Sequence, residues 1–246
     1  MTVEVVWVTP DAEKHLAYIA RVSNPDNQEN PNYAKLLKYM LDNGHWSPFE
    51  MVNLCIEINT TRDIARQILR HRSFSYQEFS QRYQTVDKLG DMVYRECRLQ
   101  DTKNRQNSLP CEDEKLAAGW EAVQYLAFQR AKGEYEGAVA AGIAKEVARA
   151  LLPEGLTPSR MYVNGTLRSW IHYVEVRCDE STQKEHREIA NAVKSKLVEL
   201  FPTVASAMGW GRMSRIVQTL ESEDFAKEMI VLSKKYPLAS TMLEQY

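Results

Sequence analysis

The densest group of reactive side chains is RHRSFSYQEFSQRY, residues 70–83. Three arginines, a histidine, three serines and a glutamate stand within fourteen residues. Guanidinium groups match phosphate oxygens through paired hydrogen bonds, and short hydroxyls can add further donors. A basic helix C-terminus would account for Arg70 to Arg72 alone, but not for the serines, Glu78 and Arg82 that follow. The combination is typical of a site for an anionic ligand with a hydrogen-bonding ring.

The common glycine-rich phosphate loops are missing from the sequence. There is no GxxxxGK[ST] and no GxGxxG, and the chain has only ten glycines. Phosphate groups would therefore have to be bound by side chains.

Two further segments carry polar side chains in a pattern. In NGTLRSWIHYVEVRCDE, residues 164–180, helical spacing places Arg168, His172 and Glu175 on one face. Trp170, Ile171 and Val174 would then form the buried face of that helix. GHWSPFE, residues 44–50, is predicted to be a turn that carries His45.

Composition narrows the class of protein. The chain has 246 residues, 44% apolar and 26% charged, with a formal net charge of −2. Such a balance disfavours a general nucleic-acid or membrane-surface binder. No apolar run approaches eighteen residues and no leader pattern stands at the N-terminus, so we expect no membrane partner and a cytoplasmic location.

The four cysteines and His186 are expected to have no role in metal binding or disulfide formation. Four scattered cysteines without a CxxC pair predict free thiols rather than a zinc site or a disulfide framework. Cys178 stands beside Arg177, a cation that could lower the pKa of its thiol. His186, between Glu185 and Glu188, is expected on the surface of a helix.

Alternating and helical patterns predict a mixed α+β domain. A helical extension of unknown role is expected to follow it, so the predicted division is 1–210 and 211–246. Thr60 or Thr61 is expected to cap the third helix, which would end around 70–72. The expected strands are 3–8, 51–59, 81–86, 92–99 and 160–164, and the expected helices are 10–22, 33–41, 61–72, 113–139, 139–152, 167–176 and 182–201.

The pattern RHRxxSxxxxSxR, from Arg70 through Arg82, resembles the signature of flavin-dependent thymidylate synthases. Gln77 stands where that signature often has asparagine, which keeps the amide but adds a methylene. Other blocks resemble the family in the same order along residues 1–210: ARVS (20–23), GHWSPFE (44–50), Gln67, EVAR (146–149) and NGTLRSWIHYVEVR (164–177).

The resemblance implies an activity and a fold. The family converts dUMP to dTMP with a methylene group from 5,10-methylenetetrahydrofolate and a hydride from NADPH that passes through FAD, without a cysteine nucleophile. Its α+β subunit has a mainly antiparallel sheet packed by long helices. It assembles as a homotetramer whose active sites are shared between chains. No metal and no nucleic acid are expected.

The resemblance also implies roles for individual residues. Arg177 matches the arginine that contacts the uracil ring and is the expected catalytic residue. The expected dUMP-binding residues are Gln67, Arg70, Glu78, Phe79, Ser80, Gln81, Arg82, Arg149 and Arg177. The expected FAD-binding residues are Ser23, His45, Ser47, Arg70, His71, Arg72, Glu78, Thr166, Leu167, Arg168 and His172.

Three alternatives stay open at this point. The first is a single-stranded nucleic-acid-binding module whose cationic, stacking groove uses Arg70, Arg72, Phe74, Tyr76 and Arg82. The second is a flavoprotein of the family that lacks synthase activity. The third is a metalloenzyme using His45, His71 and His172, which no ligand spacing supports.

Overall fold

The computed structural model describes residues 1–210 and divides them into two compact units. The first comprises residues 1–29 and 46–196, and the second, within the described part, comprises 30–45 and 197–210. The predicted extension 211–246 lies outside the described residues.

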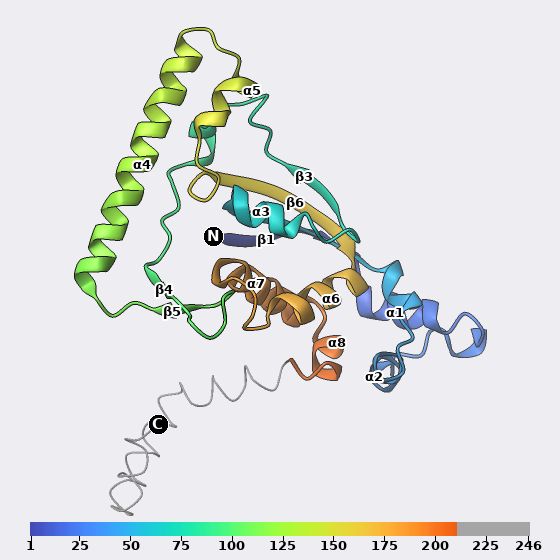
Figure 1. The fold of residues 1–246 in the computed structure, drawn as a ribbon. Helices are drawn as coiled ribbons and strands as arrows, with labels where there is room; N and C mark the ends of the chain where they lie inside the picture. The colour runs from blue at the N-terminus through green and yellow to red at the C-terminus, as the bar shows by residue number, and fades with distance from the viewer. Residues whose placement is uncertain (211–246) are drawn as a thin grey trace, which may run out of the picture. The chain divides into compact units, whose positions relative to one another are not determined.

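A four-stranded sheet organises the first unit (Figure 1). Every neighbouring pair of strands is antiparallel. Leu54, Ile56 and Ile58 alternate along the second strand and are completely buried, as the period of two predicts. In spatial order the strands are β1 (Thr2–Val8), β2 (Asn53–Thr61), β6 (Pro158–Thr166) and β3 (Ser75–Glu78).

Apolar helix faces bury the sheet core. Trp170, Ile171 and Val174 are at most 1% exposed, which confirms the predicted buried face of their helix. The indole N–H of Trp170 donates to the carbonyl oxygen of Leu54 at 3.0 Å and so ties this helix to β2. The helices of this unit around the sheet are α1 (Ala12–Ala20), α3 (Arg62–Ile68), α6 (Leu167–Arg177) and most of α7 (Lys184–Leu200).

A long helix, α4 (Glu114–Ala140), begins where the sequence predicts. The Asp113 carboxylate caps it by accepting from the backbone N–H groups of Lys115 and Leu116. The predicted continuous helix 139–152 is wrong. Gly142 has φ 88°, a left-handed conformation that ends α4, and only the short α5 (Lys145–Ala148) and η4 (Arg149–Leu151) follow.

The predicted strands 81–86 and 92–99 are also wrong. A turn follows Ser80, η3 spans Val86–Leu89, and only β4 (Arg98–Gln100) pairs with β5 (Ser108–Pro110). The backbone of Arg95 bonds instead to the side chains of Gln124 and Trp120 on α4. Side-chain contacts of this kind satisfy an extended segment without a neighbouring strand.

The remaining elements are short. The predicted helix at 33–41 is confirmed as α2 (Ala34–Asp42), which packs on α8 (Pro202–Ala207) within the second unit. Two 3₁₀ turns, η1 (Pro25–Asn27) and η2 (Ser47–Met51), lie in the first unit. None of the helices within residues 1–210 is long and apolar enough to cross a membrane.

Candidate active site

The signature segment forms the turn after α3 and then the edge strand β3. The hydroxyl of Tyr76 lies 2.8 Å from the carbonyl oxygen of Ile68 and 2.5 Å from that of His71, which fixes the turn. Phe74 is buried against Trp170, with ring centroids 4.4 Å apart. A Cβ atom at Gly165 would lie 2.2 Å from the ring of Phe74, so this close approach requires glycine.

Two of the predicted site residues meet directly, although 106 positions separate them in the chain. Arg177, at the end of α6, donates its Nε–H to Nε2 of His71 at 2.8 Å. Burial, with the positive charge of Arg177 adding to it, lowers the pKa of His71 to about 4. His71 is therefore neutral at pH 7 with its proton on Nδ1, and the charge of Arg177 is not cancelled by a carboxylate at this contact.

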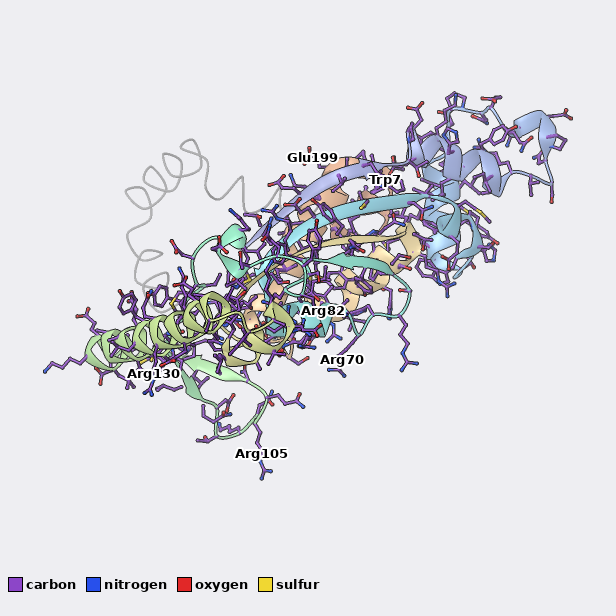
Figure 2. The ribbon with its side chains drawn as sticks, turned by 90° about the horizontal axis from the view of Figure 1, so that it is seen from above. Trp7, Arg70, Arg82, Arg105, Arg130 and Glu199 are labelled. Atoms are coloured by element: carbon purple, nitrogen blue, oxygen red, sulfur yellow. The ribbon has the colours of Figure 1, made fainter. Side chains whose placement is uncertain are left out.

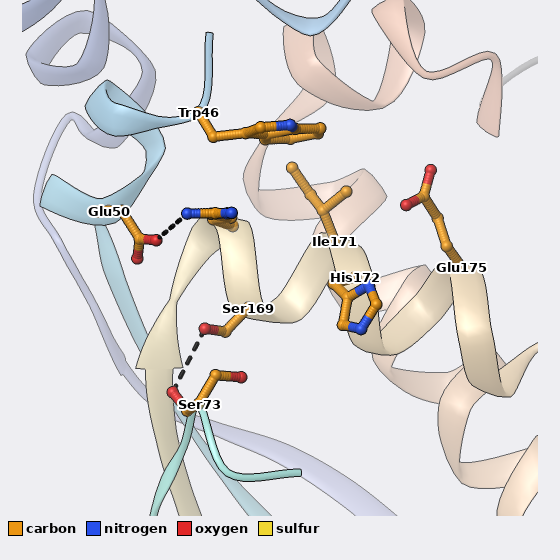
Figure 3. Close-up of a pocket in the computed structure, with 8 residues that line it drawn as sticks. Trp46, Glu50, Ser73, Ser169, Ile171, His172 and Glu175 are labelled. Atoms are coloured by element: carbon orange, nitrogen blue, oxygen red, sulfur yellow. Dashed lines mark hydrogen bonds and ion pairs between the residues drawn. The ribbon is translucent and has the colours of Figure 1, made fainter. Parts of the chain in front are cut away.

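A cavity of about 400 Å³ opens beside the N-terminal half of α6 (Figure 3). Glu50 accepts a hydrogen bond from Arg168 at 2.8 Å and another from Thr166 at 2.7 Å, which orients both side chains. The predicted polar face of the helix is confirmed, because its three members all line this cavity. The lining residues are Trp46, Glu50, Ser73, Arg168, Ser169, Ile171, His172 and Glu175.

A second hollow of about 400 Å³ lies along β3. The predicted residues Glu78, Phe79 and Ser80 line it together with Gln77, Tyr83, Arg160 and Tyr162. Glu78 accepts from the hydroxyl of Ser159 at 2.7 Å and lies 3.7 Å from Arg62. The next residue in the expected set, Gln81, is buried, and its Nε2 has no hydrogen-bond partner.

The expected arginines differ in how they are paired. Arg82 forms an exposed ion pair with Glu146 at 3.0 Å, which joins the signature to the EVAR block. Arg70 (Figure 2) and Arg72 are exposed, and neither side chain forms an ion pair or hydrogen bond within the described part of the chain. Arg149 is half-buried at the start of η4 and likewise forms no side-chain pair there.

Several expected residues are not gathered around either cavity. Ser23 is exposed in the turn after α1, and Ser47 is exposed at the start of η2. His45 belongs to the second unit, where its ring packs edge-on against Tyr39 at 5.5 Å. Leu167 is buried at the start of α6, where its backbone N–H bonds to Val52.

Comparison with known proteins decides the family. Residues 4–203 match the family model described as thymidylate synthase complementing protein. A flavin-dependent thymidylate synthase from Synechocystis sp. is 54% identical over 195 residues, which cover 79% of this chain and 88% of that protein. The chain belongs to the flavin-dependent thymidylate synthase family. The sequence resemblance is thereby confirmed.

Two further similarities agree with this membership. A probable flavin-dependent thymidylate synthase from Paramecium bursaria Chlorella virus 1 is 45% identical, over 85% of this chain and 96% of that one. The solved structure of the UMP/dUMP methylase PolB from Streptomyces cacaoi, bound with 5-Br dUMP, superposes with a TM-score of 0.74. At 24% identity, over 85% of this chain and 94% of that one, it supports the fold alone.

One expectation about this flavin-dependent thymidylate synthase family member is wrong. His186 is completely buried rather than on a surface. Its ring nitrogens lie 3.2 Å from Gln67 Oε1 and 3.1 Å from the hydroxyl of Tyr173. Burial raises the pKa of the Cys178 thiol, so proximity in sequence to Arg177 does not make it reactive.

Sequence reasoning missed part of the lining of the site. Trp46 and Glu50 stand in the block GHWSPFE but received no role. The burial of His186 had a visible signal, since Ile189, Ala190 and Val193 follow it at the spacing of a buried helix face.

The aromatic side chains of the signature are not arranged for base stacking. The nucleic-acid alternative needs Phe74 and Tyr76 in an open groove. Phe74 is only 8% exposed, and the hydroxyl of Tyr76 is bonded to backbone. Among residues 1–210, no three side chains of histidine, cysteine, aspartate or glutamate converge as metal ligands.

Proposed function

We propose that this chain catalyses the reductive methylation of dUMP to dTMP as a flavin-dependent thymidylate synthase. Its co-substrates would be 5,10-methylenetetrahydrofolate as the one-carbon donor and NADPH as the hydride source, with FAD as the cofactor. The observation that carries the proposal is the 2.8 Å contact between Arg177 and His71. It joins the two segments whose residues the family resemblance assigns to nucleotide and flavin.

The residues around the α6 cavity fit a flavin. Arg168 supplies a cation whose orientation Glu50 fixes, and Trp46 supplies an aromatic surface. Ser73, Ser169 and His172 add polar groups along the same wall. A flavin nucleotide combines aromatic rings with phosphates and hydroxyls, which such a mixed lining can bind. When bound, FAD supplies hydride transfer between NADPH and the nucleotide.

The FAD set is proposed as a whole. Thr166, Arg168 and His172 would bind FAD at the α6 cavity, and the buried Leu167 is proposed to contact it from the start of α6. The other members would contact it from elsewhere in the chain or from a neighbouring subunit: Ser23, His45, Ser47, Arg70, His71, Arg72 and Glu78.

The nucleotide would be bound by side chains rather than by a glycine loop. Arg70, Arg82 and Arg149 carry positive charges suited to its phosphate, and Ser80 would add a hydroxyl donor. Gln81 offers a buried Nε2–H group that lacks a partner, which a ligand oxygen could satisfy. Gln67, Glu78 and Phe79 complete the contacts proposed for dUMP.

Arg177 is the proposed catalytic residue. Its guanidinium would lie against the pyrimidine carbonyl region and stabilise the negative charge that develops when the ring is activated. The contact with neutral His71 uses only the Nε–H group, so the other guanidinium N–H groups stay available to substrate.

We infer that the active chain is a homotetramer with shared sites. Leu116, Trp120 and Val123 follow one face of α4, and each is more than 40% exposed. Leu126 extends this apolar surface at 66% exposure. A second copy of the chain is the partner we propose for it, since apolar helix faces of this kind are commonly buried in oligomers. Val123→Lys combined with Leu126→Lys should lower the mass measured by sedimentation, and an unchanged mass would contradict this interface.

The first experiment is an absorbance spectrum of the purified protein with added FAD, followed without oxygen after NADPH addition. We expect a bound flavin whose colour bleaches, at a rate that dUMP changes, and formation of dTMP when methylenetetrahydrofolate is present. Failure to bind flavin under any condition would overturn the proposal, and oligonucleotide binding would be measured next. With its four free cysteines, a reducing compartment such as the cytoplasm is the proposed location.

A further inference from the structure

Gln67, one of the proposed dUMP-binding residues, lies within a continuous chain of hydrogen bonds. Its Nε2 donates to Oε1 of Gln183 at 2.7 Å, and its Oε1 lies 3.2 Å from Nδ1 of His186. Beyond these, Gln183 Nε2 donates to Glu185 Oε2 at 2.9 Å, and His186 Nε2 lies 3.1 Å from the Tyr173 hydroxyl. We call these five residues the Gln67 chain: Glu185, Gln183, Gln67, His186 and Tyr173.

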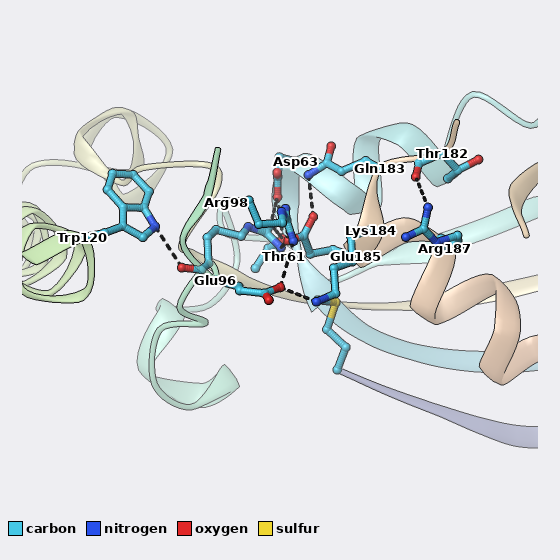
Figure 4. A network of polar contacts seen from close by, with 12 residues as sticks. Thr61, Asp63, Glu96, Arg98, Trp120, Thr182, Gln183, Lys184, Glu185 and Arg187 are labelled. Carbon is cyan, nitrogen blue, oxygen red and sulfur yellow. Dashed lines mark hydrogen bonds and ion pairs between the residues drawn. The ribbon is translucent and has the colours of Figure 1, made fainter. Parts of the chain in front are cut away.

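Glu185 determines the direction of every bond in the Gln67 chain. Its carboxylate is 6% exposed and pairs with Arg98 at 2.6 Å, with Arg95 at 3.9 Å (Figure 4). Burial acts to raise the pKa of Glu185, but hydrogen bonds from Gln183 and Arg98 outweigh it, and the pKa is lowered. An ionised carboxylate only accepts hydrogen bonds, so the group of Gln183 that faces it must be the amide nitrogen.

The remaining donors and acceptors follow in sequence. With its nitrogen toward Glu185, Gln183 presents its oxygen to Gln67, which must donate through Nε2. Gln67 Oε1 then accepts, so His186 carries its proton on Nδ1 and accepts at Nε2 from the Tyr173 hydroxyl. Burial lowers the pKa of His186 to about 3, in keeping with a neutral ring.

We propose that the Gln67 chain positions the side-chain amide of Gln67, so that its oxygen and its nitrogen each keep one fixed orientation toward a pyrimidine nucleotide. The inference rests on the proposed role of Gln67 in binding dUMP. A glutamine amide can otherwise rotate by half a turn and exchange its donor with its acceptor. Bonded at both ends, Gln67 retains one N–H and one oxygen lone pair in defined places for the ligand.

The first test does not need substrate. Nitrogen-15 NMR of the histidine-labelled protein distinguishes the two neutral tautomers, and His186→Asn identifies the signal by its loss. We expect the Nδ1–H tautomer for His186, and substitution of Tyr173 by Phe should disturb its Nε2 signal. The Nε2–H tautomer in the wild type would reverse the chain and overturn the proposal.

The second test separates positioning from chemistry. Gln183→Leu removes the partner of the Gln67 nitrogen at an exposed position. We expect about a tenfold rise in the KM for dUMP, the usual size for one lost hydrogen bond, with kcat and flavin content unchanged. Gln106→Leu is the matched control, since Gln106 is exposed and lies outside the chain.

A double-mutant cycle then asks whether Gln183 acts through Gln67. In a Gln67→Leu background, Gln183→Leu should cause no further loss of dUMP affinity. Equal losses in both backgrounds, or an unchanged KM in Gln183→Leu, would overturn the proposed device. A wild-type protein that binds no dUMP in calorimetry would instead overturn the proposed function, while the tautomer result would still stand.

Discussion

Two groups of arginines in the first unit show how the same side chain serves different purposes. Arg95 and Arg98 are 12% and 16% exposed, and carboxylates on other segments pair with both of them. Arg70 and Arg72 are exposed, without a carboxylate partner among residues 1–210. Where the charge is already neutralised, arginine ties segments together. Where it is not, it can attract an anionic ligand.

The buried group has a definite structural task. Arg95 donates to Asp63 at 2.7 Å and to Thr61, while its backbone bonds to Gln124 and Trp120 on α4. The segment between η3 and β4 has no strand neighbour, so these contacts set its position. Removing a carboxylate that pairs with a buried arginine should therefore lower the unfolding free energy strongly. Removing one that pairs with an exposed arginine should change it little.

The largest expected effect tests that contrast with two glutamates. Glu185→Ala would leave Arg98 largely buried without its closest partner, and we expect a loss of about 3–5 kcal/mol in unfolding free energy. Glu146→Ala removes the partner of exposed Arg82 and should change it by less than about 1 kcal/mol. Urea unfolding of both variants gives the comparison. Similar losses in the two would show that burial does not separate the two groups.

Arg177 lies between these groups, half-buried and paired with a neutral imidazole. Because its charge is not cancelled at that contact, we expect it to act on substrate rather than on stability. Arg177→Ala should lower kcat for dTMP formation by about 10²–10³-fold, as for loss of one donor to a developing oxyanion. The flavin spectrum should stay that of the wild type. Near-normal turnover would remove Arg177 from the catalytic role.

Arg70 offers the matching test among the exposed arginines. Arg70→Gln should leave the unfolding free energy within about 0.5 kcal/mol, since the side chain is exposed and unpaired within the described residues. It should weaken dUMP binding by about tenfold or more, the size of a lost charge-assisted hydrogen bond. Calorimetry at two salt concentrations measures this. Unchanged affinity with lost stability would place Arg70 with the buried group.

The sequence predicted the elements that bear periodic patterns. The alternation in β2, the capped start of α4 and the buried face of α6 are all observed, because burial imposes a period on each. It also predicted that Arg168, His172 and Glu175 share one helix face, which is the face that lines the α6 cavity. What it could not predict was the path of residues 81–97, because separate contacts to several elements, such as those of Arg95 with α4 and of Val93 with Leu156, set that path and leave no periodic pattern.

The site shows the same division. The family resemblance identified His71 and Arg177 as site residues, but their 2.8 Å contact depends on how α3 and α6 pack on one sheet. The role of Gln183 is likewise invisible in sequence, since a glutamine at a helix start is ordinary. Residues that act through other residues carry no signature of their own.

The neutral state of His71 and His186 predicts how the free energy of unfolding depends on pH. The folded-state pKa values of His71 and His186, about 4 and about 3, lie below the ordinary 6.5 because partial burial of His71 and complete burial of His186 disfavour the charged ring. The unfolded chain therefore binds protons first as pH falls, so stability present above pH 6.5 should decline from there toward pH 4. Urea unfolding between pH 8 and about 5.5 measures the slope above the range in which ordinary Asp and Glu side chains take up protons.

The matched variants decide whether the buried rings cause that slope. His186→Asn should flatten the decline, whereas His15→Asn changes an exposed ring and serves as the control. A decline of wild-type steepness in His186→Asn would mean that the ring is protonated in the folded protein too.

The smallest expected effect concerns the thiol beside Arg177. If the charge of Arg177 lowered the pKa of the neighbouring Cys178 thiol, Cys178 could act as a nucleophile and its loss would abolish turnover. Burial instead raises the pKa of this thiol, which keeps it protonated at pH 7. Cys178→Ala should therefore keep most of the dTMP-forming activity, within about threefold, because the lost volume is small and the side chain is only partly buried. Complete loss of turnover in a variant that still folds and binds flavin would show that the charge of Arg177 does reach the thiol, and would return Cys178 to the reaction.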